Sequence, residues 1–311
     1  MVIRPFKNGD EENIRSLFKI CFGRDMTSEE WLWKYKNSYL GSSSAVAEVG
    51  GKIIAHYGGI KMNFYYQRNI LKAYQGCDAM THPEYRSRGI IVKTAKVFYE
   101  VHSGMDFMFG FPSEAHANIS ARHLGWQKHE FINEMSKEIN IIQPQKSNWK
   151  VETGWGNIRD KELDAFWNNI KDLKDFSVEK KSDYIFWRYR DNPCQQYELV
   201  LFKGPFTRVL KAYAVVQKKG GELRVLDMLV SEAQKIKKVI SFVEKMAAER
   251  KTNRIRLWVN PYNAEYNILK EMGYKEEKGI PYALKLFEAS IFSPASFLER
   301  YNYSMGDYDA A

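Results

Sequence analysis

Apolar residues recur at helical spacing near the start of each half of the chain. In residues 10–23 they fall on one helical face, Asp10 is a residue type that begins helices, and Gly23 is a type that ends them. A similar stripe returns in residues 163–173. The pattern predicts an amphipathic helix in each half, with apolar positions at Ile14, Leu17, Phe18, Cys21 and Phe22, and at Leu163, Phe166, Trp167, Ile170 and Leu173.

Runs of β-branched and aromatic residues, broken by the glycine pairs at 50–51 and 220–221, predict strands in the same order in both halves. In the first half we expect strands at Ser44–Val49, Lys52–Phe64, Ile70–Thr81 and Asp106–Phe111, with a helix at Gly89–His102. In the second half we expect them at Tyr197–Lys203, Thr207–Lys218, Glu222–Val230 and Arg254–Val259, with a helix ending near Arg250.

Two tryptophan-rich segments mark the repeat. Trp31-Leu-Trp-Lys-Tyr35 precedes the first set of strands, and Tyr184-Ile-Phe-Trp-Arg-Tyr189 precedes the second. A Gly-aromatic pair closes each set, 92 positions (125 − 33) and 86 positions (273 − 187) after the matching tryptophan. This spacing predicts a duplicated unit, with a linker in Gln143–Asn157.

Length and composition fit two domains. The 311 residues are 44% hydrophobic, which is enough for two cores. We expect domains at 1–145 and 146–290 and a C-terminal tail at 291–311. The three cysteines are far apart and no segment has the length of a signal peptide or a membrane span, so we expect a soluble cytoplasmic protein that does not act at a membrane. The oligomeric state leaves no trace in the sequence.

The net charge of +9 is spread along the chain. Its densest clusters, at 235–238 and 250–256, alternate with apolar residues, which favours solvated helix faces over a nucleic-acid surface. A polyphosphate cofactor remains compatible with the charge. Six histidines without acidic partners at ligand spacing predict no metal site.

The segment His82–Ile91 joins a predicted strand to a predicted helix. Arg86 and Arg88 add positive charge beside free N–H groups at the helix start, and Gly89 lets the backbone approach an anion closely. This junction predicts a phosphate site. In Arg86-Ser87-Arg88-Gly89-Ile90-Ile91 the chain resembles the GNAT superfamily of acyl-CoA N-acyltransferases, whose pyrophosphate loop reads Arg/Gln-x-x-Gly-x-Gly/Ala; Ile91 departs from it.

The resemblance covers the element order of both halves. It implies an α/β (α+β) fold of two GNAT-like domains, each a mixed, mostly antiparallel sheet flanked by helices. It also implies that Ala79, Met80 and Thr81 pair with the pantetheine arm of acetyl-CoA, that Met80 N–H stabilises the thioester oxyanion, and that Asn118 contacts the arm. The second half has no glycine and carries Glu232 at the matching junction, Leu229–Lys235, so it is similar to a degenerate copy.

An amine must lose a proton before it attacks a thioester. The candidate bases are Asp78, Glu114 and His116, and the sequence does not decide among them. The family often protonates the departing thiolate with a Tyr four residues before the Gly-aromatic pair, where this chain has Ala121. If the tail docks on the first domain, Asp307, Asp309 or the terminal carboxylate reaches the acceptor site.

These features predict direct transfer of an acetyl group from acetyl-CoA to a primary amine of a small molecule, such as an amino sugar or polyamine. One alternative is a protein that binds acyl-CoA without turnover, which Ala121 favours. Another is a tRNA-dependent aminoacyl transferase, which the phosphate loop disfavours.

Overall fold

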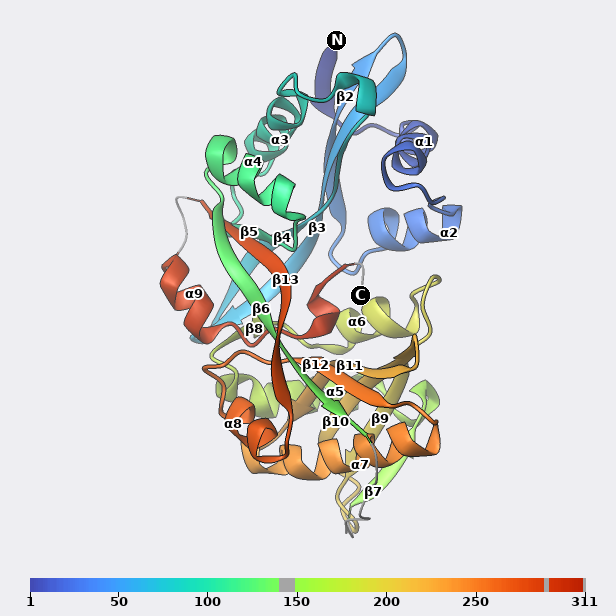
Figure 1. The fold of residues 1–311 in the computed structure, drawn as a ribbon, viewed down its shortest axis with the longest axis vertical. Coiled ribbons are helices and arrows are strands. Elements are labelled where there is room, and N and C mark those ends of the chain that lie inside the picture. The colour runs from blue at the N-terminus through green and yellow to red at the C-terminus, as the bar shows by residue number, and fades with distance from the viewer. Residues whose placement is uncertain (140–148, 288–290, 310–311) are drawn as a thin grey trace.

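A computed structural model of the chain describes residues 1–139, 149–287 and 291–309. The molecule is elongated, with two lobes stacked along its long axis (Figure 1). The predicted domain boundaries at 145/146 and 290/291, and the first part of the predicted linker, lie outside the described residues and stay predictions.

The first half contains six strands and four α-helices among the residues described. The strands predicted within it are confirmed to within two residues. Its elements are β1 (Val2–Pro5), α1 (Glu11–Phe22), α2 (Ser28–Trp31), a π-helical turn (Leu32–Lys36), β2 (Ser42–Val49), β3 (Lys52–Tyr66), β4 (Asn69–Thr81), a 3-10 turn (Pro83–Tyr85), α3 (Ile90–Val101), β5 (Phe107–Gly110), α4 (Glu114–Leu124) and β6 (Gln127–Glu138).

The second half repeats this order, and its predicted strands are confirmed to within three residues. Its elements are β7 (Lys150–Thr153), α5 (Asp160–Ile170), β8 (Phe176–Val178), α6 (Ser182–Ile185), a π-helical turn (Phe186–Arg190), β9 (Glu198–Lys203), β10 (Leu210–Lys219), β11 (Glu222–Val230), α7 (Ile236–Glu249), β12 (Arg254–Trp258), α8 (Ala264–Glu271), β13 (Lys275–Leu286) and α9 (Pro294–Arg300). Short 3-10 turns lie at Trp155–Asn157, Lys171–Leu173, Ala233–Lys235 and Met305–Asp307.

Helix α1 shows how local signals set an element. Gly23 ends it in the left-handed conformation at φ 72°, and its N–H donates to the carbonyl of Lys19, as predicted. The predicted cap at Asp10 differs, because the Asp10 side chain makes no capping hydrogen bond. Its carboxylate instead accepts two hydrogen bonds from the Arg4 guanidinium, at 2.7 and 2.8 Å, which tie the helix start to β1.

The two halves share one sheet. Twelve strands follow the order β1-β2-β3-β4-β5-β13-β6-β12-β11-β10-β9-β7, and β8 pairs with β3 off this path. The last strand of each half has crossed into the other: β13 lies between β5 and β6, and β6 lies between β13 and β12. In Figure 1 these two long strands cross the waist of the molecule side by side. The exchange joins the lobes through main-chain hydrogen bonds.

The internal repeat is confirmed by a reciprocal contact. Trp33 Nε1 donates to the carbonyl of Trp187 at 2.7 Å, and Trp187 Nε1 donates to the carbonyl of Trp33 at 3.0 Å. The two indoles stack with centroids 5.3 Å apart. Each tryptophan lies in a π-helical turn of five residues, so the two turns meet as equivalents at the interface of the halves.

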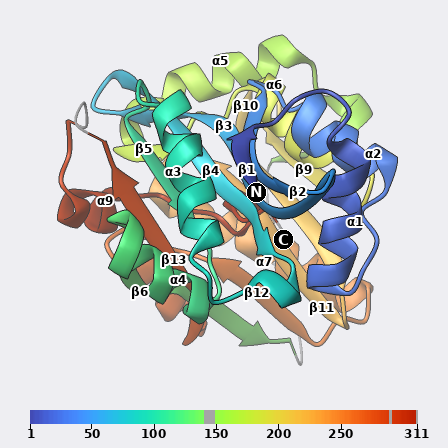
Figure 2. The ribbon, with the colours of Figure 1, turned by 90° about the horizontal axis from the view of Figure 1, so that it is seen from above.

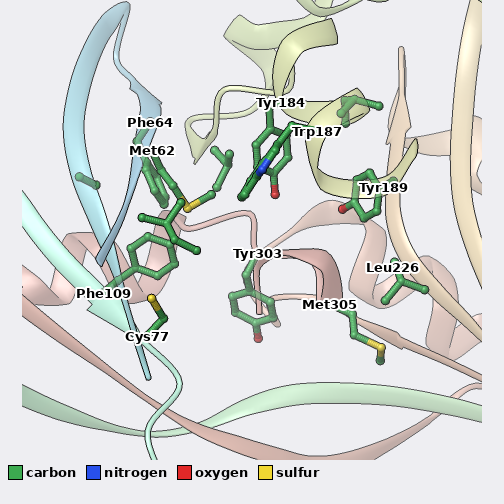
Figure 3. Close-up of a cluster of buried hydrophobic side chains, with 14 of the residues drawn as sticks. Met62, Phe64, Cys77, Phe109, Tyr184, Trp187, Tyr189, Leu226, Tyr303 and Met305 are labelled. Carbon is green, nitrogen blue, oxygen red and sulfur yellow. The ribbon is translucent and has the colours of Figure 1, made fainter. Parts of the chain in front are cut away.

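The C-terminal tail docks between the lobes. Figure 3 shows Tyr303 and Met305 of the tail in a buried cluster with Phe64 and Phe109 of the first half and Trp187 of the second. The tail is therefore part of the main core.

Candidate functional site

Strands β4 and β5 run parallel and then separate. Their last paired residues are Gln75 and Phe109. Gly76 and Gly110 follow on the two strands, and a Cβ atom added to Gly110 would lie 3.4 Å from the carbonyl oxygen of Gly76. The glycines therefore keep the apex of the gap free of side chains. Figure 2 shows α3 and α4 on one side of β4 and α1 and α2 on the other.

A β-bulge lies on β4 at the widening gap. His56 of β3 is opposite Met80, but Gly58 is opposite Cys77, so Asp78 is the extra residue, with φ 46°. The buried His56 ring donates its Nδ1 hydrogen to the carbonyl of Asp78 at 2.8 Å. Burial lowers the pKa of His56, so the ring is neutral. Its Nδ1–H donor holds the bulge in place.

The bulge turns the Asp78 carboxylate toward Lys34. Lys34 Nζ lies 2.9 Å from Asp78 and 2.8 Å from Asp309 of the tail, and Tyr35 donates its hydroxyl to Asp78 at 2.5 Å. Burial alone would raise the pKa of Asp78, but Lys34 and Tyr35 outweigh it and lower the pKa. We call Asp78, Lys34 and Asp309 the carboxylate–lysine triad. It holds two negative charges and one positive charge.

A cavity of about 400 Å³ occupies the gap and is lined by residues from both sides of the sheet. Its α4 side is lined by Tyr57, Gly76, Ala79, Gly110, Ser113, His116, Ser120, Trp126 and Ala283. Its α1 side is lined by Phe18, Phe22, Arg24, Glu30, Trp33, Lys34, Cys77, Asp78, Phe111, Tyr308 and Asp309. Two molecules that enter from opposite faces of the sheet would meet between β4 and β5.

The predicted phosphate loop, Arg86–Ile91, begins α3 as expected. Gly89 is its N-cap at φ 67°, and no atom lies within 4 Å of the position that a Cβ would take, so the backbone is open to an anion. Arg86 and Arg88 are exposed; Arg86 Nε donates to the carbonyl of Thr81 at 3.2 Å. Ile91 stands where the family has a small residue. Its side chain packs against the core beneath α3 and not over the loop.

The three candidate bases lie in different environments. Asp78 faces the α1 side of the cavity. His116 lines the α4 side, where burial lowers its pKa and leaves the imidazole neutral near pH 7. Glu114 begins α4 with 71% of its side chain exposed, 3.5 Å from Lys128, and does not line the cavity.

The remaining predicted cofactor residues also lie in different environments. Ala79 lines the cavity, whereas Met80 packs into the core on the α1 side. Asn118 is exposed, and its side-chain oxygen accepts from Lys128 at 3.2 Å. These positions do not test a contact with the cofactor, so the roles of Asn118 and Met80 stay predictions.

Sequence reasoning missed Ser120, which lies one turn after His116 on the same side of α4. It is 2% exposed, lines the cavity, and its hydroxyl has no hydrogen-bond partner among the described residues. Buried hydroxyl groups are normally paired, so this one is available to a ligand. Its spacing of four from His116 was the available signal.

The second half has the same gap, between β11 and β12, but the tail fills it. The two strands are paired up to Val225 and Leu257. Beyond that point Asn260 donates its amide to the carbonyl of Tyr301 at 2.9 Å, and a space of only about 60 Å³ remains. The expectation that only the first half binds acyl-CoA agrees with this difference.

Comparison with known proteins gives the family. Residues 2–128 match the family model described as "Acetyltransferase (GNAT) domain". The match covers most of the first half of the chain, which therefore resembles a GNAT domain. No curated protein sequence matches the chain.

Solved structures share the fold of the whole GNAT pair. One is a conserved protein of unknown function and probable N-acyltransferase from Enterococcus faecalis, with TM-score 0.76, 8% identity, and coverage of 96% of this chain and 75% of that one. A tandem GNAT protein from the clavulanic acid biosynthesis pathway has TM-score 0.58, 10% identity, and coverage of 93% and 99%. Saccharomyces cerevisiae N-myristoyltransferase with bound myristoyl-CoA has TM-score 0.61, 7% identity, and coverage of 94% and 86%. The predicted fold of two GNAT-like units is confirmed.

Two features are absent from the described residues. None of their helices has the length and apolar composition needed to cross a bilayer. They also contain no group of three His, Cys, Asp or Glu side chains that is arranged to hold a metal ion.

Proposed function

We propose that this protein is an acyl-CoA-dependent N-acyltransferase that moves an acyl group, most simply acetyl, from CoA to a primary amine of a small molecule. The observation that carries the proposal is the cavity between β4 and β5, which is lined by residues from both sides of the sheet. Such a passage brings a thioester and an amine together without a covalent enzyme intermediate. This geometry supports direct transfer in a ternary complex.

The phosphate loop and the free edge of β4 are the proposed acyl-CoA contacts. The N–H groups of Ile90 and Ile91 and the positive end of α3 would bind the pyrophosphate, with charge from Arg86 and Arg88. The edge of β4 beyond Gln75 would pair with the pantetheine arm through Ala79, Met80 and Thr81. Ser87, at φ 62°, completes the turn into Gly89.

Proton transfers are assigned by the side of the cavity. The amine arrives on the α1 side, so Asp78 is the proposed acceptor of its proton, directly or through water. The amine nitrogen then attacks the thioester carbon, the carbon–sulfur bond breaks, the nitrogen loses its second proton to water as the amide forms, and the CoA thiolate departs on the α4 side. There the Ser120 hydroxyl and the His116 ring are the proposed hydrogen-bond donors to the thiolate, in place of the tyrosine that Ala121 replaces.

Acyl-CoA binding is tested at the phosphate loop. The double variant Arg86→Ala/Gly89→Glu places a carboxylate where phosphate would lie, so we expect calorimetry to detect no acetyl-CoA binding. Arg86→Ala/Arg88→Ala leaves the backbone unchanged and should weaken binding by roughly tenfold or more, about 1.4 kcal/mol. Lys235→Ala/Ala233→Glu, at the matching junction of the second half, is the control and should bind normally. Unchanged binding by both loop variants would refute the assignment.

A CoA-binding protein without turnover is the second candidate, favoured by Ala121. Release of free CoA thiol in the presence of primary amines separates the two functions. We expect release that depends on the amine and falls at least tenfold in Ser120→Ala/His116→Ala, in line with the loss of general acid catalysis. Tight acetyl-CoA binding with no release for any amine would favour the non-catalytic function.

A further inference from the structure

A pair of tyrosines leads from the α4 side of the cavity toward the surface at α3. Tyr57 of β3 lines the cavity and is 2% exposed. Its hydroxyl lies 2.9 Å from the hydroxyl of Tyr99, a residue of α3 whose side chain is partly exposed. Because a phenol can both donate and accept a hydrogen bond, this pair can pass a proton between the cavity and solvent.

Trp126 favours one direction of donation within the pair. Its indole Nε1 lies 2.7 Å from the Tyr99 oxygen and can only donate, so that oxygen is the acceptor. The Tyr99 hydrogen then points away from Trp126 and can be donated to Tyr57. In that arrangement the Tyr57 hydrogen is left for a group inside the cavity.

Both hydroxyl groups hold their protons at neutral pH. Burial raises the pKa of Tyr57 well above its ordinary value and raises the pKa of Tyr99 to about 12, although hydrogen bonds from Trp126 and Tyr57 act against the second increase. The Lys285 ammonium lies 5.1 Å from the centre of the Tyr99 ring and donates to the carbonyl of Leu124. A cation at this distance favours the release of a proton from Tyr99.

Departure of the CoA thiolate requires a proton on this side of the cavity. Ser120 can donate a hydrogen bond to the thiolate, but its hydroxyl has no partner among the described residues that would return a proton to it. His116 is neutral because burial lowers its pKa, and loss of its ring proton would leave a buried anion. Tyr57 lines the same side and has Tyr99 behind it.

We infer that Tyr57 is a catalytic residue, which gives its hydroxyl proton to the departing CoA thiolate and regains one from Tyr99. The Tyr57 oxygen–hydrogen bond breaks and a sulfur–hydrogen bond forms, while Ser120 and His116 hold the sulfur by hydrogen bonds. Tyr99 replaces its own proton from water, which receives the second proton of the amine. The inference rests on the proposed transferase function.

Nuclear magnetic resonance of bound CoA tests the contact without turnover. In isotopically labelled CoA, the chemical shift of the carbon bonded to sulfur reports the ionisation of the thiol as the pH is varied. A hydrogen bond from Tyr57 favours the thiolate, so Tyr57→Phe should raise the pKa of the bound thiol by about one or more. Phenylalanine keeps the ring in place, so the variant should still bind CoA in calorimetry.

Acyl transfer tests delivery of the proton. With an amine that the parent chain accepts, Tyr57→Phe should lower kcat by about tenfold or more and leave the KM for acetyl-CoA within about twofold. Tyr99→Phe should leave the thiol pKa near that of the parent and lower kcat by a smaller factor, because Tyr57 keeps its contact but loses its source of protons. Tyr262→Phe is the control, since its side chain is 71% exposed and lies outside the cavity lining.

The outcomes separate this inference from the proposed function. Tyr57→Phe with the thiol pKa and kcat of the parent would overturn the inference and keep the transferase. Weaker CoA binding by this variant with no change in thiol pKa would assign Tyr57 to packing alone. A shifted thiol pKa without CoA release for any amine would overturn proton delivery and leave a thiol contact in a non-catalytic protein. A parent chain that binds no CoA would overturn the proposed function and the relay with it.

Discussion

Deletion of residues 301–311 is expected to prevent the protein from folding. Tyr301 is 0% exposed, Tyr303 7% and Met305 5%, and all three pack in the core that joins the two halves. Truncation of one buried aromatic side chain costs roughly 3–5 kcal/mol, and whole domains are stable by only about 5–15 kcal/mol. Loss of the three side chains together therefore removes most of the available stability.

Near-ultraviolet circular dichroism and urea unfolding measure this effect. The deleted chain should lack a cooperative transition, whereas Tyr301→Ala should keep one with the unfolding free energy lowered by about 3–5 kcal/mol. Leu173→Ala is the control because its side chain is 64% exposed, so its unfolding should resemble that of the parent chain. A deleted chain with a cooperative transition at the parent's urea midpoint would show that the tail only rests on a preformed core.

The substitution Lys180→Met is expected to lower the free energy of unfolding by roughly 3–5 kcal/mol at pH 7. Lys180 Nζ lies 2.8 Å from Asp227 of β11 and 2.8 Å from Asp307 of the tail, and all three side chains are at most 2% exposed. Methionine preserves the length of the side chain but leaves two buried carboxylates without a cation. The cost comes from those unpaired charges, since nearly the same volume remains filled.

The pH dependence of this loss has a definite sign. Burial raises the pKa of Asp227 even with Lys180 present. The contribution of this carboxyl to stability is therefore complete when the pH is below its ordinary pKa, and it declines as the pH rises through the raised pKa. Removal of the lysine takes away the main influence that lowers this pKa. The deficit of Lys180→Met in urea unfolding should therefore be smaller at pH 5 than at pH 7.

Lys237→Met provides the matched control, because Lys237 pairs with Glu271 on the surface and both side chains are at least half exposed. Its effect should stay below about 1 kcal/mol at either pH. A Lys180→Met variant as stable as this control, or a deficit that grows on acidification, would contradict the role assigned to the buried lysine.

Among the strands that sequence reasoning overlooked, β6 and β13 are the two that join the lobes. Sequence patterns identified β2, β3, β4 and β5, whose partners follow within a few tens of residues and whose turns carry glycine pairs. They gave no signal for β6 or β13. In that pair Leu284 lies opposite Gln127, a partner more than 150 positions away, and the segments themselves mix charged and apolar residues.

The candidate site divides along the same line. The phosphate loop was predictable because its chemistry is local: a strand, a turn with Gly89 at positive φ, two arginines and a helix start lie in one short segment. The α1 side of the cavity was predictable only in part: the sequence named Asp78 and Asp309 as candidates, but not Lys34 or the contact among the three. Lys34, Asp78 and Asp309 come from three distant segments, and none of them stands in a motif that names the other two.

By itself, the sequence determined the repeated unit, the helices and most strands, and the glycine-arginine loop that begins α3, because side-chain periodicity, turn residues and helix-end charge act over a few neighbouring positions. Only the tertiary structure decided the exchange of β6 and β13, the docking of the tail into the second gap, and the contact of Lys34 with Asp78 and Asp309 beside the cavity. Those features depend on contacts between segments far apart in the chain. Packing and charge pairing between them arise only when the chain has folded, and they leave no periodic mark on the sequence.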